Sequence, residues 1–406
     1  MLHPHDIFSA SEPWTIRIVS LAKEFKDKGH EVKLAYCPLF INEEKWAFDL
    51  EGIEIVSLNR IVGLWNLFYN LQKIKELTQW ADIIHFQKCF HYISFPALIC
   101  GWLLNKPLHY DWDDWEEKIW YHSNSKSIHT LIFGNFIKLL ERIIPVLVDT
   151  ISVSSSKLEE LCLSFGVQKN RIFKAPVGAD LKKFNPTISS KELKRKYNLD
   201  SKMTILYLGQ LHGAQYVNIF IEAASLVLLK HPDTIFLIVG QGYMLNQLKE
   251  LVARFGIADS VIFTGSVPHS LVPEYIAAAD ICVACFENNE LTVCKSPLKV
   301  VEYLASGKPI VASSVGEIPN MVGDAGLLEE PGNHRLLAEA IVNLIENPQL
   351  RQEMSFRARQ RAEVRYNWGK TAENLLRAYE KNTNFKGTMR YEVKTEGLGE
   401  LTLKNI

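Results

Sequence analysis

The chain has 406 residues, of which 47% are hydrophobic and 22% are charged, as in a folded globular protein. This length exceeds what one hydrophobic core normally holds and predicts two domains of about 150 to 200 residues each. Because 45 basic side chains nearly balance 46 acidic ones, there is no large field of one sign, and wholesale binding to nucleic acid is not expected.

Both halves of the chain share one pattern, in which short runs rich in β-branched and aromatic residues alternate with helical stretches. The runs cover residues 31–36, 53–56, 82–86, 107–111, 150–154 and 171–175, and then 203–209, 234–240, 261–265, 281–285 and 308–313. Such alternation is typical of βαβ units and parallel sheets. We therefore predict an α/β protein with two Rossmann-like, doubly wound domains.

The expected domain limits follow from the polar, proline-flanked stretch at 176–190, which indicates a linker. We predict an N-terminal domain over residues 1–180, a C-terminal domain over 181–367, a helix over 368–380 and a tail over 381–406 with no assigned role. Only Met1 and Leu2 precede the first polar loop, although a doubly wound domain normally opens with a strand. Either the chain starts late and lacks that strand, or the domain is built unusually.

The cysteines bear on the cellular compartment. Their odd number, seven, and their wide spread do not suggest a disulfide framework and favour a reducing compartment. Cys282 and Cys285 form a C-x-x-C pattern within an apolar run, where side chains three residues apart point to opposite faces of a strand, so a metal role is not expected. The N-terminus has no basic region followed by an apolar core, so we expect no signal peptide and a cytoplasmic protein.

No run of about 18 apolar residues predicts a membrane-spanning helix. Residues 128–148 come nearest, but they carry three charges and Pro145, so we predict a buried amphipathic helix followed by a turn. Residues 60–80 mix aromatic side chains with lysines, and the alternative to core packing there is a helix on a bilayer surface. Peripheral attachment to the inner face of the membrane is therefore kept as an alternative.

The most informative loop begins at Lys295, because ligands of open α/β sheets bind where the carboxyl ends of strands lead into helices. A helix that starts here offers backbone N–H groups and a positive dipole end to a diphosphate. Lys295 and Lys299 add positive charge, and Glu302 is placed to accept hydrogen bonds from ribose hydroxyls. The alternative is a capped surface helix with solvated lysines. The other residues of this candidate loop are Ser296, Pro297, Leu298 and Val300.

Three further loops follow strands of the second half and contain glycine, which permits close approach of the backbone to a ligand. Each loop alone is as consistent with a plain turn, but together the three would ring one crevice. The residues predicted to contact a donor there are Gly209, Gln210, Gln215, Gly240, Gly242, Gly265 and Val267.

Acidic, aromatic and histidine side chains follow the strands of the first half. Carboxylates accept hydrogen bonds from sugar hydroxyls, and indole faces pack against sugar C–H surfaces. We predict that Asp113 or His85 orients an acceptor; the alternatives are charge at a helix N-terminus for the acidic residues and a core histidine for His85. The residues predicted to bind the acceptor are His5, Asp6, Asp111 and Asp114.

Several motifs occur in the order in which one known family has them. They are GHEV at 29–32, SVSSSKLEEL at 152–161, APVGADLKKFNP at 175–186, the stretch 238–283 and SPLKVVEYLASGKPIVAS at 296–313. On these residues the chain resembles the retaining GT-B glycosyltransferases with an E-x7-E motif (glycosyl transferases group 1, bacterial cell-surface polysaccharide type), over residues 3–380.

The resemblance implies two Rossmann-like domains facing a cleft, with a nucleotide-sugar donor held by the C-terminal domain and a glycan or lipid-linked acceptor by the N-terminal one. It also implies polysaccharide biosynthesis, transfer with retention of anomeric configuration, and no cofactor or obligatory metal. Carried onto this chain, Glu302 is the ribose-binding second glutamate of the motif. Residues 296–300 are then the diphosphate loop and residues 265–267 the nucleobase contact, and Lys299 offsets diphosphate charge.

The chain departs from the family pattern at three positions. Cys294 replaces the first glutamate of the motif, and Gln210 and Gln215 replace an arginine and a lysine that grip the diphosphate. Loss of one group that stabilises developing charge commonly costs about a hundredfold in rate, unless Lys295, Lys299 or His212 compensates. Two alternatives to a transferase therefore stay open: a non-catalytic nucleotide-sugar-binding partner of another glycosyltransferase, and a GT-B nucleotide-sugar epimerase.

Overall fold

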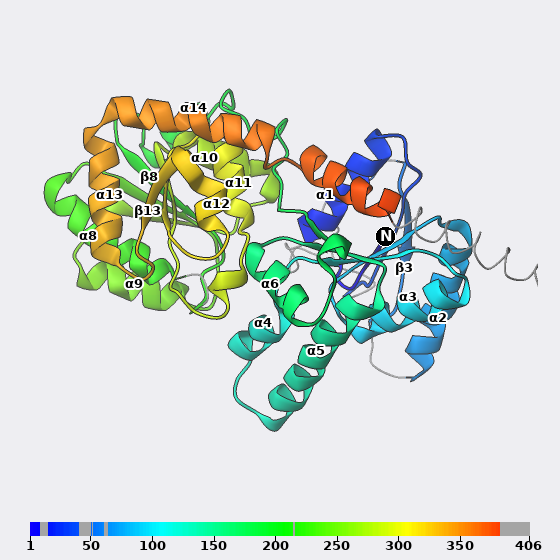
Figure 1. Ribbon diagram of the computed structural model, residues 1–406. Helices are drawn as coiled ribbons and strands as arrows, with labels where there is room; N and C mark the ends of the chain where they lie inside the picture. The colour runs from blue at the N-terminus through cyan, green and yellow to red at the C-terminus, as the bar shows by residue number, and fades with distance from the viewer. Residues whose placement is uncertain (9–14, 40–49, 51, 61–63, 214–215, 382–406) are drawn as a thin grey trace, which may run out of the picture. The chain divides into compact units, whose positions relative to one another are not determined.

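The computed structural model describes residues 1–8, 15–39, 50, 52–60, 64–213 and 216–381. The chain divides into two compact units (Figure 1). Unit 1 comprises Met1–Ala175 together with the chain from Thr371, and unit 2 comprises Pro176–Lys370. Each unit is described by itself.

Unit 1 is built on a parallel sheet with the strand order β3-β2-β1-β4-β5-β6-β7. Its strands are β1 (Leu2–His3), β2 (Lys33–Tyr36), β3 (Glu54–Ser57), β4 (Ile84–Gln87), β5 (Leu108–Trp112), β6 (Thr150–Val153) and β7 (Ile172–Lys174). Strands β4 and β5 are buried along their whole length, because helices cover both faces of a parallel sheet.

Strand β1 was not predicted from the sequence. It has only two residues, yet Leu2 pairs with Ala35 of β2 on one side and with Phe86 of β4 on the other. The direction of strand succession reverses between β1 and β4, so the polar loop at Pro4 leaves the sheet at its topological switch point, where open α/β sheets bind ligands.

The helices of unit 1 form two layers (Figure 1). They are α1 (Ile16–Asp27), α2 (Leu64–Trp80), α3 (His91–Leu103), α4 (Glu116–Ser123), α5 (Ile128–Leu147) and α6 (Ser156–Ser164), and residues 371–381 are also helical. Helix α1 lies beside residues 371–381, where the rings of Phe25 and Tyr379 are 5.5 Å apart. Helices α2, α3 and α5 cover the other face, as right-handed crossovers require when strand succession reverses.

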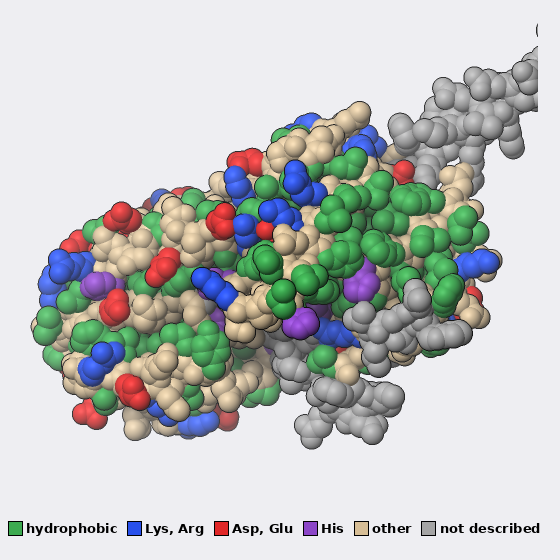
Figure 2. All heavy atoms as spheres, turned by 90° about the horizontal axis from the view of Figure 1, so that it is seen from below, with side chains coloured by type: hydrophobic (Ala, Val, Ile, Leu, Met, Phe, Trp, Pro, Cys, Tyr) green, Lys and Arg blue, Asp and Glu red, His purple; other side chains and the backbone are tan. Residues whose placement is uncertain are grey.

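Helix α5 differs from the prediction for residues 128–148. It runs through Pro145 to Leu147 without a turn, and only its inner side is buried. Its outer side exposes large apolar residues, among them Ile128, Ile132 and Ile143. Figure 2 shows hydrophobic side chains gathered over a broad area on the displayed face of unit 1.

Unit 2 contains a second parallel sheet, with the order β10-β9-β8-β11-β12-β13. Its strands are β8 (Thr204–Leu208), β9 (Ile235–Val239), β10 (Val261–Gly265), β11 (Ile281–Ala284), β12 (Ile310–Ser313) and β13 (Gly326–Glu329). The sequence pattern predicted all of these except β13, a half-buried edge strand with the sequence GLLE, which lacks β-branched residues.

The helices of unit 2 enclose this sheet and its large apolar core. They are α7 (Lys191–Tyr197), α8 (Val217–Lys230), α9 (Leu245–Arg254), α10 (Val272–Ala278), α11 (Leu298–Ala305), α12 (Ile318–Val322), α13 (His334–Glu346) and α14 (Pro348–Val364). The segment that resembles a linker in sequence also packs here. Phe184 is buried in this core, and the Ala179 amide donates to the Tyr366 carbonyl at 2.9 Å.

Two further observations concern the cysteines and the character of the helices. All seven cysteines are among the described residues; every one is buried, and none forms a disulfide. Across the described ranges, no helix combines the length and apolar character that crossing a membrane requires.

Candidate functional site

The N-terminus of α11 lies at the carboxyl edge of the unit 2 sheet. Strand succession reverses between β8 and β11, which makes this the switch point of that sheet. The Tyr303 hydroxyl fixes the helix there, because it accepts a hydrogen bond from the Leu208 amide at 3.0 Å, at the end of β8. The N-cap residue is Pro297, whose side chain offers no acceptor to the first helical N–H groups.

Lys299, in the first turn of α11, lies among aromatic and backbone groups. Its side chain is 9% exposed, and Nζ is 4.3 Å from the centre of the Tyr207 ring. A Cβ atom built on Gly209 would lie 2.7 Å from Nζ, so the absence of a side chain at Gly209 makes room for the ammonium. Burial lowers the pKa of Lys299 to about 7. A bound anion would favour the charged form.

Glu302, one turn further along α11, is held by a histidine from another loop. The His269 ring belongs to a short 3-10 helix (His269–Leu271) after β10, and its Nε2 lies 2.7 Å from Glu302 Oε1. Burial lowers the pKa of His269, but the charge and hydrogen bond of Glu302 outweigh this effect, so its pKa is raised. Sequence reasoning missed His269, because a histidine after Pro268 has no recognisable spacing to Glu302.

Two of the predicted donor-contact glycines lie where backbone loops pack against one another, so they do not line an open crevice. A Cβ on Gly240 would lie 1.8 Å from the Gly209 carbonyl oxygen, and one on Gly242 would lie 2.1 Å from that of Leu211. These loops are joined by backbone hydrogen bonds, including Gly240 N–H to the Gly265 carbonyl at 3.0 Å. Of Gly209, Gly240, Gly242 and Gly265, only Gly265 has no atom within 4 Å of the place where a Cβ would lie.

The other residues predicted to contact a donor are placed as follows. Gln210 Oε1 lies 3.0 Å from His212 Nε2, the Ser296 hydroxyl donates to Met321 Sδ at 3.7 Å, and Lys295 Nζ is 5.7 Å from the Phe286 ring. Val300 is buried, whereas Val267 and Leu298 pack half-buried against the core. Cys294 is buried in a 3-10 helix that precedes α11, and Gln215 lies outside the described residues.

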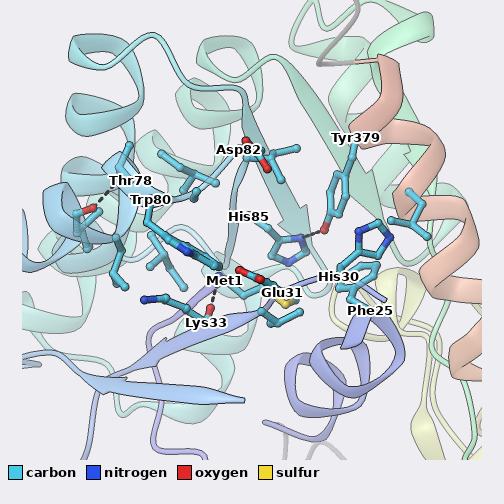
Figure 3. Close-up of a pocket in the computed structure, with 18 of the residues that line it drawn as sticks. Met1, Phe25, His30, Glu31, Lys33, Thr78, Trp80, Asp82, His85 and Tyr379 are labelled. Atoms are coloured by element: carbon cyan, nitrogen blue, oxygen red, sulfur yellow. Dashed lines mark hydrogen bonds between the residues drawn. The ribbon is translucent and has the colours of Figure 1, made fainter. Parts of the chain in front are cut away.

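In unit 1, His85 was expected to orient an acceptor, but it lies inside β4, near the start of the strand. It is 2% exposed, and its Nδ1 is 2.6 Å from the Tyr379 hydroxyl. Figure 3 shows both side chains facing a cavity of about 520 Å³, whose lining includes residues 29–33 and 80–85 at the starts of β2 and β4. His85 therefore belongs to the amino edge of the sheet, opposite the edge where ligands bind.

Asp111 forms a buried ion pair. Arg17 donates to both of its carboxylate oxygens, at 2.7 and 2.8 Å, and the Ser152 hydroxyl donates to Oδ1 at 2.5 Å. Burial raises the pKa of Asp111, but Arg17 outweighs this effect, so its pKa is lowered. Asp111 has no exposed surface, so in this arrangement its carboxylate does not face a site that an acceptor could occupy.

Asp113 joins a polar cluster at the carboxyl ends of β4 and β5. Gln87 Nε2 donates to Asp113 Oδ2 at 2.6 Å, and Lys88 Nζ is 3.3 Å from Oδ1. Lys88 also forms a buried ion pair with Glu116, the first residue of α4. Burial raises the pKa of Glu116 to about 7 although Lys88 opposes the shift. The sequence offered no recognisable motif at Gln87 or Lys88, the last residue of β4 and the one that follows it, before the start of α3.

The remaining acceptor candidates lie around the loop after β1. Asp6 accepts hydrogen bonds from the amides of Phe8 and Leu39, at 2.9 and 3.0 Å, and so shapes this loop. His5 Nδ1 is 3.1 Å from an Arg60 nitrogen. Asp114 is half-buried after β5, and its charge contributes to raising the pKa of Lys88, whose burial acts the other way.

The sequence of unit 2 is similar to a known family. Residues 189–361, all within this unit, match the family of glycosyl transferases group 1. The two parallel sheets also agree with solved GT-B glycosyltransferases, which confirms the predicted fold class of two Rossmann-like domains.

Two named glycosyltransferases match part of this chain. Alpha-D-kanosaminyltransferase of Streptomyces kanamyceticus is 26% identical over 190 residues, 46% of this chain and 48% of the relative. Alpha-monoglucosyldiacylglycerol synthase of Streptococcus pneumoniae is 28% identical over 279 residues, 67% of this chain and 60% of the relative. In both cases the match covers less than two thirds of the relative.

Among solved structures, HepE from Anabaena in complex with UDP has a TM-score of 0.73, with 93% of this chain and 98% of HepE covered. HepE has also been solved with UDP-glucose. At 17% sequence identity this likeness shows a shared fold and nothing finer.

Proposed function

We propose that this chain is a glycosyltransferase that moves a sugar from a nucleoside diphosphate to a hydroxyl group of a glycan or lipid-linked acceptor. The observation that carries the proposal is the pair of side chains on α11. Glu302 is positioned by His269, and Lys299 lies against Gly209 at the switch point of the unit 2 sheet. A carboxylate for ribose hydroxyls and an ammonium for a diphosphate, one helical turn apart, fit a nucleotide sugar.

The proposed reaction requires stabilisation of the negative charge that develops on the departing diphosphate. The bond between the anomeric carbon and the diphosphate oxygen breaks while a bond to the acceptor oxygen forms, and the acceptor proton passes to the departing diphosphate. Negative charge develops on that diphosphate, where Lys299 and the first N–H groups of α11 would stabilise it. We further propose retention of configuration, which requires attack on the face that the diphosphate leaves.

For the acceptor side we propose the cluster of Asp113, Lys88 and Glu116 at the carboxyl edge of the unit 1 sheet. Carboxylates here would accept hydrogen bonds from acceptor hydroxyls. A cytoplasmic location, with peripheral attachment at the inner face of the membrane, remains part of the proposal. The buried, unbridged cysteines support a reducing compartment.

A second candidate function is a nucleotide-sugar-binding partner that does not itself catalyse transfer. Cys294 favours it, because a buried thiol stands where the motif has a carboxylate, and Gln210 offers no positive charge. In that case the donor would bind but would not turn over.

The first experiment is a thermal-shift screen of UDP, GDP and ADP sugars, because a ligand that binds the folded state raises its apparent stability. It is followed by turnover assays with the nucleotide that binds, over a panel of acceptors. We expect Glu302→Ala to lose most of the binding and activity, whereas Glu346→Ala, in an exposed pair with His231, keeps both. Donor binding without transfer or donor hydrolysis would favour the second candidate. Full activity of Glu302→Ala would refute the proposed role of Glu302 in donor binding.

A further inference from the structure

The outer side of α5 is apolar, although it faces away from the core of unit 1. Large apolar residues recur along it at helical spacing, with exposed fractions between 41% and 70%: Ile128, Leu131, Ile132, Leu139, Ile143 and Val146. The inner side is apolar as well, with Ile137, Leu140 and Ile144 buried. A helix that is apolar on both sides normally lies inside a protein or against a membrane.

Helix α3 extends this apolar surface. The two helices are neighbours, because the ring of Phe136 on α5 is 5.5 Å from His91 and 6.5 Å from Phe95 on α3. At its C-terminal end α3 exposes Trp102 and Leu103, by 51% and 76%. The apolar area on the displayed face of unit 1 in Figure 2 is therefore larger than the scattered exposed apolar residues of an ordinary surface.

The exposed charged side chains of α5 are basic, and one of them, Lys138, places its Nζ 3.6 Å from Oε1 of the buried Glu117 of α4. Lys138 and Arg142 are exposed one turn apart beside the apolar stripe, and Lys126 is exposed in the loop that leads into α5. The one acidic residue of α5, Glu141, is turned inward, where it accepts hydrogen bonds from the indole of Trp112 and from backbone amides at the start of α4. The outer side of α5 thus combines apolar residues with cations and carries no acidic side chain.

From this combination we propose that the outer side of α5, together with the end of α3, docks unit 1 on the surface of an anionic lipid bilayer. The apolar stripe would enter the boundary between headgroups and acyl chains, while Lys126, Lys138 and Arg142 would contact lipid phosphates. Trp102 suits the same boundary, since its ring is amphipathic. The helix would lie in the plane of the surface, because none of the described helices has the character of a membrane span.

A second copy of the chain is a less suitable occupant. In a two-fold symmetric contact the same patch serves both partners, which would bring the cations at Lys138 and Arg142 of each copy together over an apolar surface. An anionic bilayer instead neutralises them. The inference does not depend on the proposed glycosyl transfer, because it concerns helices remote in sequence from Glu302 and Lys299.

The test is sedimentation of the full chain with vesicles of phosphatidylcholine alone or mixed with phosphatidylglycerol. We expect the protein to bind the mixed vesicles more tightly than the neutral ones, and less tightly as salt rises. Ile132→Glu/Leu139→Glu should weaken binding at least about tenfold, since two apolar side chains leave the membrane and two anions enter. Lys126→Glu/Lys138→Glu should abolish the preference for phosphatidylglycerol.

The matched control is Leu229→Glu/Phe356→Glu, at residues of unit 2 that are 81% and 71% exposed. This variant should bind vesicles like the unmodified chain, and melting curves should show that all variants fold. Failure of the unmodified chain to bind either kind of vesicle would overturn the proposal, and so would an equal loss in the control. Light scattering that shows a dimer, converted to a monomer by Ile132→Glu/Leu139→Glu, would assign the surface to a second copy instead.

Discussion

His269 Nε2 lies 2.7 Å from Glu302 Oε1, so the carboxylate that we propose for ribose is oriented by a ring from the loop after β10. The Phe184 ring, 5.5 Å from His269, supports the other side of the imidazole. In the function proposed above, donor binding would therefore depend on His269, which acts by holding Glu302 in place.

The first prediction concerns this pair. Replacing His269 with alanine should raise the dissociation constant for UDP at least about fivefold, since a hydrogen bond to a charged group is worth about 1.5–3 kcal/mol. His269→Gln, which keeps an N–H donor, should recover part of the loss. Calorimetry measures both, and His231→Ala, in the exposed pair with Glu346, is the control expected to bind normally. Unchanged binding in His269→Ala would refute the positioning role.

The second prediction concerns pH. Burial lowers the pKa of Lys299 to about 7 in the free protein. The side-chain amine is therefore mostly protonated below that pH and mostly neutral above it. A diphosphate favours the charged form, so above about pH 7 binding must first protonate the amine. We expect UDP affinity to fall as pH rises, by up to roughly tenfold per unit.

The control for this pH effect is the variant Lys299→Met, which should bind UDP weakly at every pH and lose the downward slope. Titration of the ligand phosphate itself is common to both proteins and cancels in the comparison. Lys230→Met, at the exposed end of α8, should retain the slope of the unmodified chain. A slope that persists in Lys299→Met would show that another group is responsible.

The third prediction separates two glycines of the donor loops. Gly240→Ala places a Cβ atom 1.8 Å from the Gly209 carbonyl oxygen, so the loops must move apart, and we expect a loss of more than about 2 kcal/mol in unfolding free energy. In Gly265→Ala the new Cβ would have no atom within 4 Å, so the only expected loss of unfolding free energy comes from the positive φ of +76°, about 1–2 kcal/mol. Denaturant unfolding should rank the two in this order.

The fourth prediction tests the buried pair in unit 1. Arg17→Met leaves Asp111 buried without its cation and should cost about 3–5 kcal/mol of stability. The double variant Arg17→Met/Asp111→Asn removes both charges and should recover a large part of that loss. If both variants unfold at the same denaturant concentration, the pair is not the stabilising contact that its geometry indicates.

Much of the fold could be predicted because its signals are local. Runs such as 234–240 are apolar and β-branched, and their structure as strand β9 follows from short-range preference and burial. Two strands, β1 and β13, were not predicted, for different reasons. β1 has two residues, too few for any periodicity, and β13 is an edge strand of mixed composition.

The candidate site was predictable only in part. The loop into α11 carries Lys299 and Glu302 within one helical turn, so sequence spacing alone places them together. His85 was predicted to orient an acceptor, but it lies near the start of β4, where its ring meets Tyr379. Such a contact joins residues far apart in the chain, and no local pattern reveals it.

By itself, the sequence determined two doubly wound sheets and the helix that carries Lys299 and Glu302 one turn apart, because burial and helical spacing act over a few residues. The tertiary structure alone decided that His269 holds Glu302, that Lys88 joins Asp113 and Glu116, and that the outer side of α5 stays uncovered. These relationships depend on which strands are neighbours and on what packs over each helix, and both are settled by contacts between distant parts of the chain.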